Sequence, residues 1–158
     1  MSVLIKNATI ISPQSKFHKT TKDILIEKGV ITKIASRISE PKAKIISSPN
    51  LHASIGWLDI GAVSGEPGFE HRESFDTLSK TAASGGYTGL AIFPNTAPVI
   101  DNKATLQYVL NATQHHPVSY YPIGAVSKNC EGNDITEMID MSQHGAVGCS
   151  GVSQSIAS

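Results

Sequence analysis

The sequence predicts an α/β protein that contains the first four strands of a TIM-type β/α barrel, preceded by a small antiparallel β unit. Three features of the 158 residues lead to this fold class. Short β-branched runs separated by turn-forming residues occupy the N-terminal third. From residue 54 onward, strand-like and helix-like patterns alternate with a recurrence of about thirty residues. The later strand-like segments are nearly continuous apolar runs, as expected for parallel strands covered by helices.

Two domains follow from this change of pattern. Residues 1–53 are expected to form the β unit, and residues 54–158 the first half of a barrel. The β unit is predicted from four runs, which are Val3–Ile5, Thr9–Ile11, Asp23–Ile26 and Val30–Ile34. Turn-forming pairs such as Ser12-Pro13 and Lys28-Gly29 separate them. The apolar side of the unit is expected to consist of Ile24, Ile26, Val30, Ile31 and Ile34.

The half-barrel is predicted from four strands and three helices in alternation. The strands are expected to begin near Trp57, Thr88, Ser119 and Ala146. The first helix should follow Glu73, with Phe75, Leu78 and Ala82 at helical spacing and Gly85-Gly86 as its C-terminal stop.

The other two helices are predicted from similar signals. Asp101-Asn102 is typical of an N-terminal cap, and the second helix should run through Leu106, Val109 and Leu110 and end before Pro117. The third should run from about Asp134 to Gly145. Its apolar stripe is expected to consist of Ile135, Met138, Ile139 and Met141.

A closed barrel of this type has eight strands and eight helices. The missing half therefore has to come from sequence outside these residues, from a partner chain or from a different packing, because an open half-barrel leaves strand edges and apolar faces uncovered. A doubly wound sheet has the same alternation. No GxGxxG motif follows the first strand, so its dinucleotide-binding version gains no support.

Composition argues against several kinds of partner. The 13 Lys and Arg residues balance the 13 Asp and Glu residues, which disfavours electrostatic binding to nucleic acid or to an anionic membrane. No segment approaches the ~20 apolar residues of a membrane span, and the first residues lack the pattern of a secretory signal, so a cytoplasmic location is expected. Cys130 and Cys149 form no CxxC pair and are interpreted as small buried hydrophobic residues.

Several stretches resemble one enzyme family. His52–Asp59 followed by Glu66–Glu73 is similar to the signature around the first barrel strand of dihydroorotases, the cyclic amidohydrolases of pyrimidine biosynthesis. Gly85–Asn102 is similar to the second strand of that family and the loop after it, while Tyr121–Val126 and Gly145–Ser150 resemble the third and fourth strands. The resemblance spans nearly the whole chain. It implies an amidohydrolase-like β/α barrel beside a composite β domain to which the N-terminal unit contributes.

The resemblance also implies that the zinc site is lost. In active relatives the first strand ends with an Asp-x-His-x-His-x-Arg pattern, whose histidines bind zinc and whose arginine holds the substrate carboxylate. In this chain Gly61 and Val63 occupy the histidine positions, Gly65 occupies the arginine position, and Gly151 replaces a family aspartate ligand. Zinc takes N, S or O ligands from side chains, and these residues have none. We therefore predict no catalytic residue and no bound zinc in this segment, because without the metal hydroxide is nearly absent at neutral pH.

Other family positions survive. Asn95 matches a substrate-binding asparagine, with loop capping as the alternative role. Glu66 and Glu70 are expected to have structural roles, and Asp59 a structural hydrogen bond. No HxH or HExxH spacing remains among the histidines, and His115-His116 is interpreted as a solvated helix end.

Three interpretations of function stay open from the sequence. The leading one is a catalytically inactive dihydroorotase-like protein with a scaffold or assembly role. It would act as a homo-oligomer or in a complex with a pyrimidine-pathway enzyme such as aspartate carbamoyltransferase, a partner implied by the resemblance alone. The alternative is an active metal-dependent cyclic amidohydrolase whose ligands come from outside this segment. The third is a fragment without activity of its own.

Overall fold

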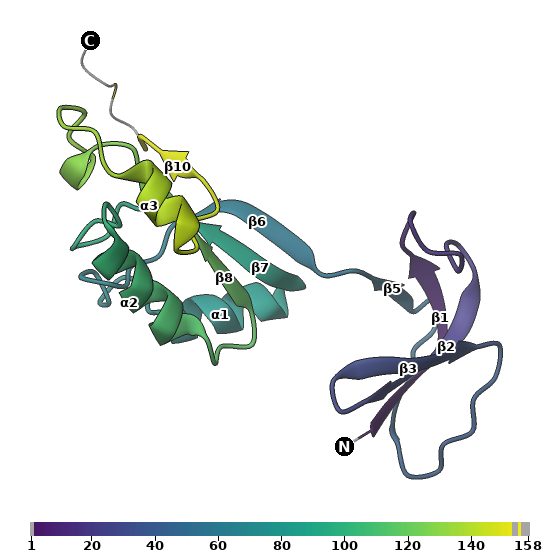
Figure 1. Cartoon of the computed structure of the whole chain (residues 1–158). Coiled ribbons are helices and arrows are strands. Elements are labelled where there is room, and N and C mark those ends of the chain that lie inside the picture. The colour runs from purple at the N-terminus through teal and green to yellow at the C-terminus, as the bar shows by residue number, and fades with distance from the viewer. Residues whose placement is uncertain (1, 153–154, 156–158) are drawn as a thin grey trace. The chain divides into compact units, whose positions relative to one another are not determined.

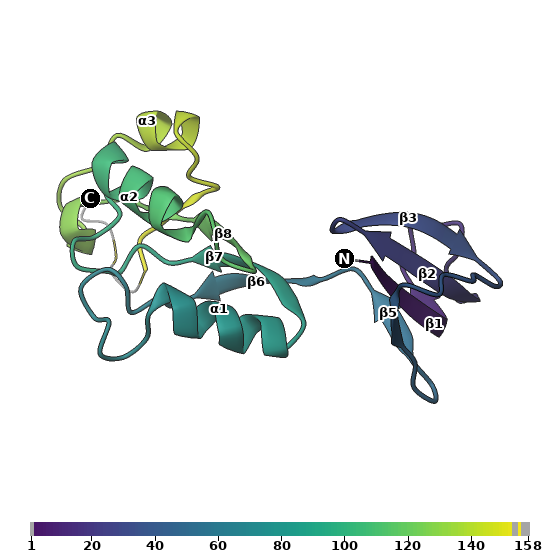
Figure 2. The same cartoon turned by 90° about the horizontal axis from the view of Figure 1, so that it is seen from below.

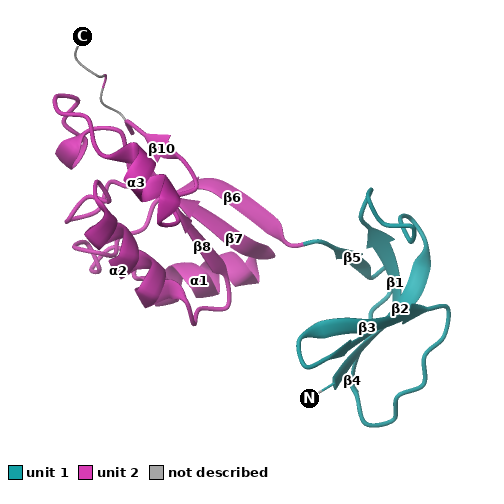
Figure 3. Ribbon diagram, in the orientation of Figure 1, with its two compact units in different colours: residues 1–55 teal, residues 56–158 magenta. Residues whose placement is uncertain are grey.

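The computed structural model describes residues 2–152 and 155, and it divides into two compact units (Figures 1 and 3). Unit 1 spans residues 1–55 and unit 2 spans residues 56–158. The domain boundary expected between residues 53 and 54 lies inside strand β5, His52–Ser54, which pairs with β1 and so belongs to unit 1. In the described part of the chain, no helix is long and apolar enough to cross a membrane.

Unit 1 is a five-stranded mixed sheet. Strands β1, Ser2–Ile11, β2, Thr21–Glu27, and β3, Val30–Ala35, form the expected antiparallel arrangement. The short strands β4, Lys44–Ile46, and β5 pair in parallel with β1, so the predicted antiparallel unit is extended into a mixed sheet. The reason is the path of the chain, which leaves β3 at one edge and returns to the opposite edge in the direction of β1.

The apolar side of unit 1 is narrower than expected. Ile24 is buried, and Ile26 and Ile34 pack against its cluster. Val30 and Ile31 are 63% and 56% exposed, so their assignment to the core is wrong. Both lie at the start of the edge strand β3, directly after the Lys28-Gly29 turn, where no neighbouring strand covers them.

A buried carboxylate holds unit 1 together. The side chain of Asp23 accepts hydrogen bonds from the backbone N–H of Asn7 at 3.0 Å and of Ile38 at 2.9 Å, and Lys6 Nζ lies 3.7 Å from Oδ2. Burial favours the neutral acid, but the two N–H groups and the Lys6 ammonium outweigh it and lower the pKa of Asp23. The charged carboxylate thereby anchors the irregular turn of β1 at Asn7 and the loop that contains Ile38.

Unit 2 contains the four parallel strand paths of a half-barrel. Strands β6, Trp57–Ala62, β7, Tyr87–Ile92, and β8, Ser119–Pro122, pair in sequence order. The third path continues through Ile123 into β9, Gly124–Ala125, which pairs with β10, Cys149–Ser150. The fourth strand was expected from Ala146 and is shorter than predicted, although the Val147 N–H already donates to the Pro122 carbonyl.

The first two helices of unit 2 match their predictions. Helix α1, Phe75–Ser84, begins at a Ser74 cap, whose side chain accepts from the N–H of Thr77. Helix α2, Lys103–Thr113, begins at Asn102, whose side chain accepts from two N–H groups of the first turn. Both caps satisfy backbone donors that a helix leaves free at its start.

Helix α3, Met138–Gln143, is shorter than predicted. Residues 134–137 are not helical, because Thr136 donates hydrogen bonds to Val126 and Ala125 and Ile135 forms a bridge with Ser127. Ile135 and Ile139 are therefore exposed, and of the four-residue stripe only Met138 and Met141 pack against the core. A single turn at Lys128–Cys130 is a 3-10 helix.

Helices α1 and α2 cover one face of the barrel sheet. Helix α1 contacts β7 and α2 contacts β8 (Figure 2). Phe75, Leu106 and Val109 form one cluster with Leu90 and Ile92 of β7. This layer is the core of unit 2, and it covers one face of the sheet.

Tyr120 links α1 to β8 inside this core. Its hydroxyl donates to the Phe75 carbonyl at 2.7 Å and accepts from Ser79 Oγ at 2.8 Å. Burial raises the pKa of Tyr120, which keeps the hydroxyl protonated as a donor.

Tyr120→Phe is expected to lower the free energy of unfolding by about 2 kcal/mol, because the carbonyl of Phe75 and the hydroxyl of Ser79 lose a buried partner. Urea denaturation monitored by circular dichroism measures the change. Tyr108→Phe, on the exposed side of α2, is the control and should leave the midpoint unchanged. Equal midpoints for the two variants would contradict the role given to Tyr120.

Candidate functional site

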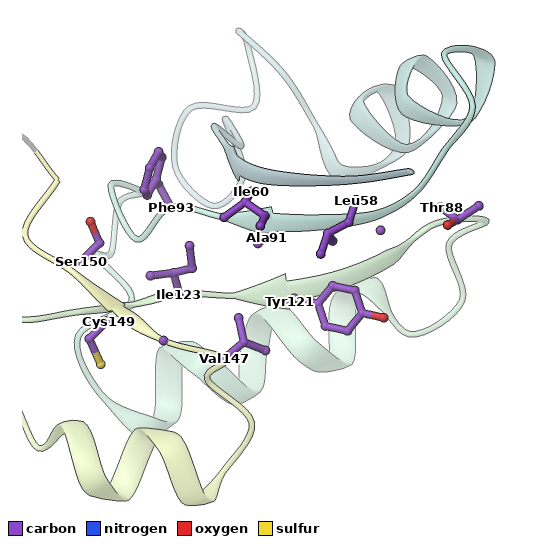
Figure 4. A pocket seen from close by; sticks show the side chains of 12 residues that line it. Leu58, Ile60, Thr88, Ala91, Phe93, Tyr121, Ile123, Val147, Cys149 and Ser150 are labelled. Carbon is purple, nitrogen blue, oxygen red and sulfur yellow. The ribbon is translucent and has the colours of Figure 1, made fainter. Parts of the chain in front are cut away.

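The face of the barrel sheet opposite α1 and α2 lines a hollow of about 610 Å³ (Figure 4). Its lining comes from β6, β7, β8 and the segment that leads into β10, with Thr88, Cys149 and Ser150 among the polar groups. Seven apolar side chains dominate it, and we call this set the inner face: Leu58, Ile60, Ala91, Phe93, Tyr121, Ile123 and Val147. The lining holds no charged side chain.

The family site positions follow the ends of these strands. Parallel strands all end at the same edge of a sheet, and that edge carries the active site in β/α barrels. Gly61, Val63 and Gly65 lie at or just after the end of β6, Asn95 follows β7, and Gly151 follows β10. The structure therefore places the positions singled out from the sequence at one edge of unit 2.

An aromatic ring lies beside the first of the lost histidine positions. Gly61 has φ +114°, a conformation that favours glycine, and the pairing of β6 with β7 is irregular there. A Cβ at Gly61 would lie 3.0 Å from Cε2 and 3.1 Å from Cζ of Phe93. A side chain at Gly61 would therefore lie against the apolar Phe93 ring. The second histidine position, Val63, is exposed.

Backbone atoms fill the arginine position. A Cβ at Gly65 would lie 2.3 Å from the Glu73 carbonyl oxygen and 2.6 Å from the Phe69 carbonyl oxygen. The Phe69 N–H also donates to the Gly65 carbonyl at 2.6 Å, so the loop closes directly onto this glycine. No side chain fits here without movement of the backbone.

The family zinc does not fit the residues at these positions. Gly61, Val63 and Gly151 offer no N, S or O side-chain donor, and a phenyl ring borders the first of them. Within residues 2–152 and 155, no three His, Cys, Asp or Glu side chains gather as a metal site would require.

The loop around the lost site is well ordered by hydrogen bonds. Ser64 Oγ donates to the Glu66 carbonyl at 2.8 Å, and the Glu66 carboxylate accepts from the N–H of Phe75 at the start of α1 at 2.9 Å. The N–H of Gly68 donates to Glu70 Oε1 at 2.8 Å and lowers the pKa of that carboxyl. The structural roles expected for Glu66 and Glu70 are confirmed.

Asn95 keeps an unpaired acceptor. Its Oδ1 is buried and has no hydrogen-bond partner within the described part of the chain. The turn after β7 is instead held by the Pro94 carbonyl, which accepts from Thr96 and Ile100, so loop capping by Asn95 Oδ1 is not observed. Buried acceptors are normally paired. The role of Asn95 in substrate binding stays a prediction.

The remaining candidates are scattered. Asp59 is exposed on the edge strand β6, and its expected structural hydrogen bond is absent among the described residues. His115 is exposed, whereas the His116 ring packs edge-on against Phe75 and Tyr120. Cys149 is exposed and Cys130 half-buried, so their assignment as buried hydrophobic residues is wrong, although partial burial raises the pKa of both thiols.

An uncovered apolar face was expected of an open half-barrel, but the residues of the inner face were not named from the sequence. Its members alternate along each strand, as Leu58 and Ile60, Ala91 and Phe93, and Tyr121 and Ile123. Alternate residues of a strand point to opposite faces of the sheet, so these residues share the face that points away from the helices. The same alternation is visible in the strand-like runs of the sequence.

Comparison with known proteins shows what the chain is similar to. No family model matches it. Dihydroorotases from Acetivibrio thermocellus and Syntrophotalea carbinolica are 38% and 36% identical to it over 149 and 148 residues, which are 94% and 93% of this chain. The dihydroorotase from Ruminiclostridium cellulolyticum is 34% identical over 151 residues. This chain is a homologue of dihydroorotases. It matches their N-terminal portion and spans about a third of their length, 35% in each of these three cases.

Solved structures support the fold of this dihydroorotase homologue. L-hydantoinase from Arthrobacter aurescens superposes with a TM-score of 0.75 at 24% identity, over 93% of this chain and 32% of that one. A dihydroorotase crystal structure gives 0.65 at 13% identity, over 94% and 41%. At these identities the likeness shows the fold alone. The predicted partial β/α barrel preceded by a β unit is confirmed, with the mixed sheet of unit 1 as the correction.

Proposed function

We propose that this dihydroorotase-like segment is not catalytic and that its half-barrel has a role in assembly. The observation that carries the proposal is the state of the family site. Its four positions hold Gly61, Val63, Gly65 and Gly151; backbone atoms block a side chain at Gly65, and Gly61 has a positive φ and lies against the Phe93 ring. A complex with a pyrimidine-pathway enzyme such as aspartate carbamoyltransferase, and a cytoplasmic location, remain proposals.

One observation favours the alternative of an active cyclic amidohydrolase completed by sequence outside this segment. The buried Oδ1 of Asn95 has no partner in the described residues, and a substrate donor would satisfy it. We rank this alternative second, because the acceptor alone supplies neither a metal nor a nucleophile.

Zinc content and ring opening of dihydroorotate separate the two proposals. We expect the 158-residue chain, produced with zinc in the medium and then dialysed, to hold far less than one zinc per chain and to show no turnover. The dihydroorotase of Acetivibrio thermocellus, treated in parallel, is the positive control for the turnover assay. Stoichiometric zinc together with turnover by this chain would overturn the non-catalytic proposal.

A further inference from the structure

We propose that unit 1 binds the phosphate group of a phosphate monoester in a hollow between Lys28, Lys42 and Lys44. The hollow lies at one end of the sheet of unit 1 and has a volume of about 420 Å³. Ser2 and Glu27 complete its lining. The site uses residues of unit 1 alone, so it is independent of the catalytic question in unit 2.

The zero net charge of the chain is the sum of two units of opposite charge. Unit 1 holds nine of the 13 Lys and Arg residues but only three of the 13 Asp and Glu residues, which gives it a formal net charge of +6. Unit 2 holds the other four basic and ten acidic residues, for a formal net charge of −6. A charge of this size raises the local concentration of anions around unit 1. Neutrality of the whole chain therefore does not exclude an anionic partner for this unit.

The acidic residues of unit 1 do not neutralise the three lysines. Asp23 is buried, and its partner is Lys6, at 3.7 Å. Glu27 lines the hollow, but its Oε2 accepts a hydrogen bond from Thr32 Oγ1 at 2.7 Å. Among the described residues, no carboxylate forms an ion pair with Lys28, Lys42 or Lys44. Three ammonium groups and one carboxylate leave the lining with a formal charge of +2.

The pairing of the strands brings the three lysines together. Strand β1 lies between β2 and β4, and its first residues pair with the end of β2 and the start of β4. Lys28 directly follows β2, whereas Lys44 begins β4 opposite Val3 of β1. Lys42 lies in the loop that leads into β4. Three segments thus place like charges around one hollow, an arrangement that costs free energy unless an anion is bound.

The charge of the hollow favours a phosphate monoester. Lysine binds phosphate as a point charge. A monoester carries nearly two negative charges at neutral pH, which match the formal charge of +2. A soluble phosphorylated metabolite and a lipid with a phosphomonoester headgroup share this chemistry.

A single-stranded nucleic acid fits the hollow less well. Such strands bind to basic grooves in which their bases stack on aromatic rings. The lining of the hollow has no aromatic side chain. Phe17 is the one Phe, Tyr or Trp residue of unit 1, and Lys16 Nζ already lies 5.2 Å from the centre of its ring. The hollow therefore offers contacts to phosphate but none to a base.

The test is a titration of the ¹⁵N-labelled 158-residue chain with inorganic phosphate, followed by amide chemical shifts. We expect saturable shifts at Ser2, Lys28, Lys42 and Lys44. The double variant Lys42→Gln, Lys44→Gln should bind phosphate about tenfold or more weakly, because it loses two charge-assisted contacts.

The double variant Lys16→Gln, Lys19→Gln is the matched control. It removes the same charge from exposed positions of unit 1 outside the hollow, so its affinity for phosphate should change by less than about twofold. The spectra also show whether each variant is folded, and Lys28→Gln replaces the first double variant if that one is not. Absence of shifts at millimolar phosphate would overturn the proposal. An equal loss of affinity in both double variants would do the same, because it indicates attraction to unit 1 as a whole.

Two further arms identify the source of the phosphate. Sedimentation with phosphatidylcholine vesicles that depends on added phosphatidic acid, and is lost in the Lys42→Gln, Lys44→Gln variant, indicates a lipid headgroup. Binding of inorganic phosphate without such sedimentation indicates a soluble ester. Decauridylate that shifts residues across unit 1, in a chain that does not respond to inorganic phosphate, would show a nucleic-acid partner and refute the site. None of these results changes with zinc content or turnover, so the non-catalytic proposal stands or falls separately.

Discussion

Gly65→Ala is expected to lower the free energy of unfolding of this chain by about 3 kcal/mol. The added Cβ would meet the carbonyl oxygens of Glu73 and Phe69 at 2.3 and 2.6 Å, and both are backbone atoms that cannot rotate away. Gly65→Arg, which restores the family residue, should cost at least as much. Urea denaturation followed by circular dichroism measures both effects.

Gly148→Ala is the matched control for Gly65. Gly148 lies beside β10, and an added Cβ there meets nothing within 4 Å, so the change should stay within about 0.5 kcal/mol. If Gly65→Ala unfolds at the wild-type midpoint, the loop over residues 65–73 does not close on this glycine as described. Restoring all four family side chains is expected to yield no hydrolysis of dihydroorotate, because the backbone around Gly65 blocks the arginine.

Asp23→Ala is expected to destabilise the chain by about 3 kcal/mol at neutral pH. The change removes an ionised acceptor from two backbone N–H groups, those of Asn7 and Ile38, and leaves Lys6 without its partner. Asp76→Ala is the control, because Asp76 forms only an exposed pair with Lys80 and should change stability by less than about 1 kcal/mol. Similar midpoints for the two variants would show that Asp23 does not hold unit 1 together.

The pH dependence gives a second readout for Asp23. Its pKa is lowered in the folded chain, so its contribution to stability is complete above the ordinary value of 3.8 and is lost as the pH falls through the lower folded value. The difference in unfolding free energy between wild type and Asp23→Asn should therefore shrink on acidification below pH 3.8. A difference that stays constant through this range would contradict the charged role of Asp23.

Capping residues and apolar periodicity predicted the helices whose ends are fixed by interactions between residues near in sequence. Helix α1 starts after Glu73 and α2 starts at Asn102 because each has a capping side chain next to an apolar stripe. Helix α3 was predicted too long, since Thr136 bonds to the neighbouring strand path and holds the preceding residues out of the helix. Val30 was assigned to the core on its residue type alone, yet exposure depends on which strand lies at the edge.

For the candidate site, the sequence predicted which side chains are missing but not which atoms surround their positions. The absence of ligand side chains at Gly61 and Val63 is visible in the sequence, because the family pattern fixes the positions to inspect. The contact of Gly61 with Phe93 joins residues 32 positions apart, and the contact of Gly65 with Glu73 depends on the path of the intervening loop. Neither follows from a periodicity or a motif, since both depend on packing between segments.

The Phe93 ring beside Gly61 has a consequence for how such a site can change over evolutionary time. A histidine returned to position 61 alone would meet the ring at once, and it would also adopt an unfavourable backbone conformation at φ +114°. A smaller residue introduced first at position 93 would remove a neighbour from Gly61 without any gain in metal binding. A histidine at position 61 is therefore expected to cost fold stability before any metal can bind, so recovery of this ligand position requires changes at both Gly61 and Phe93.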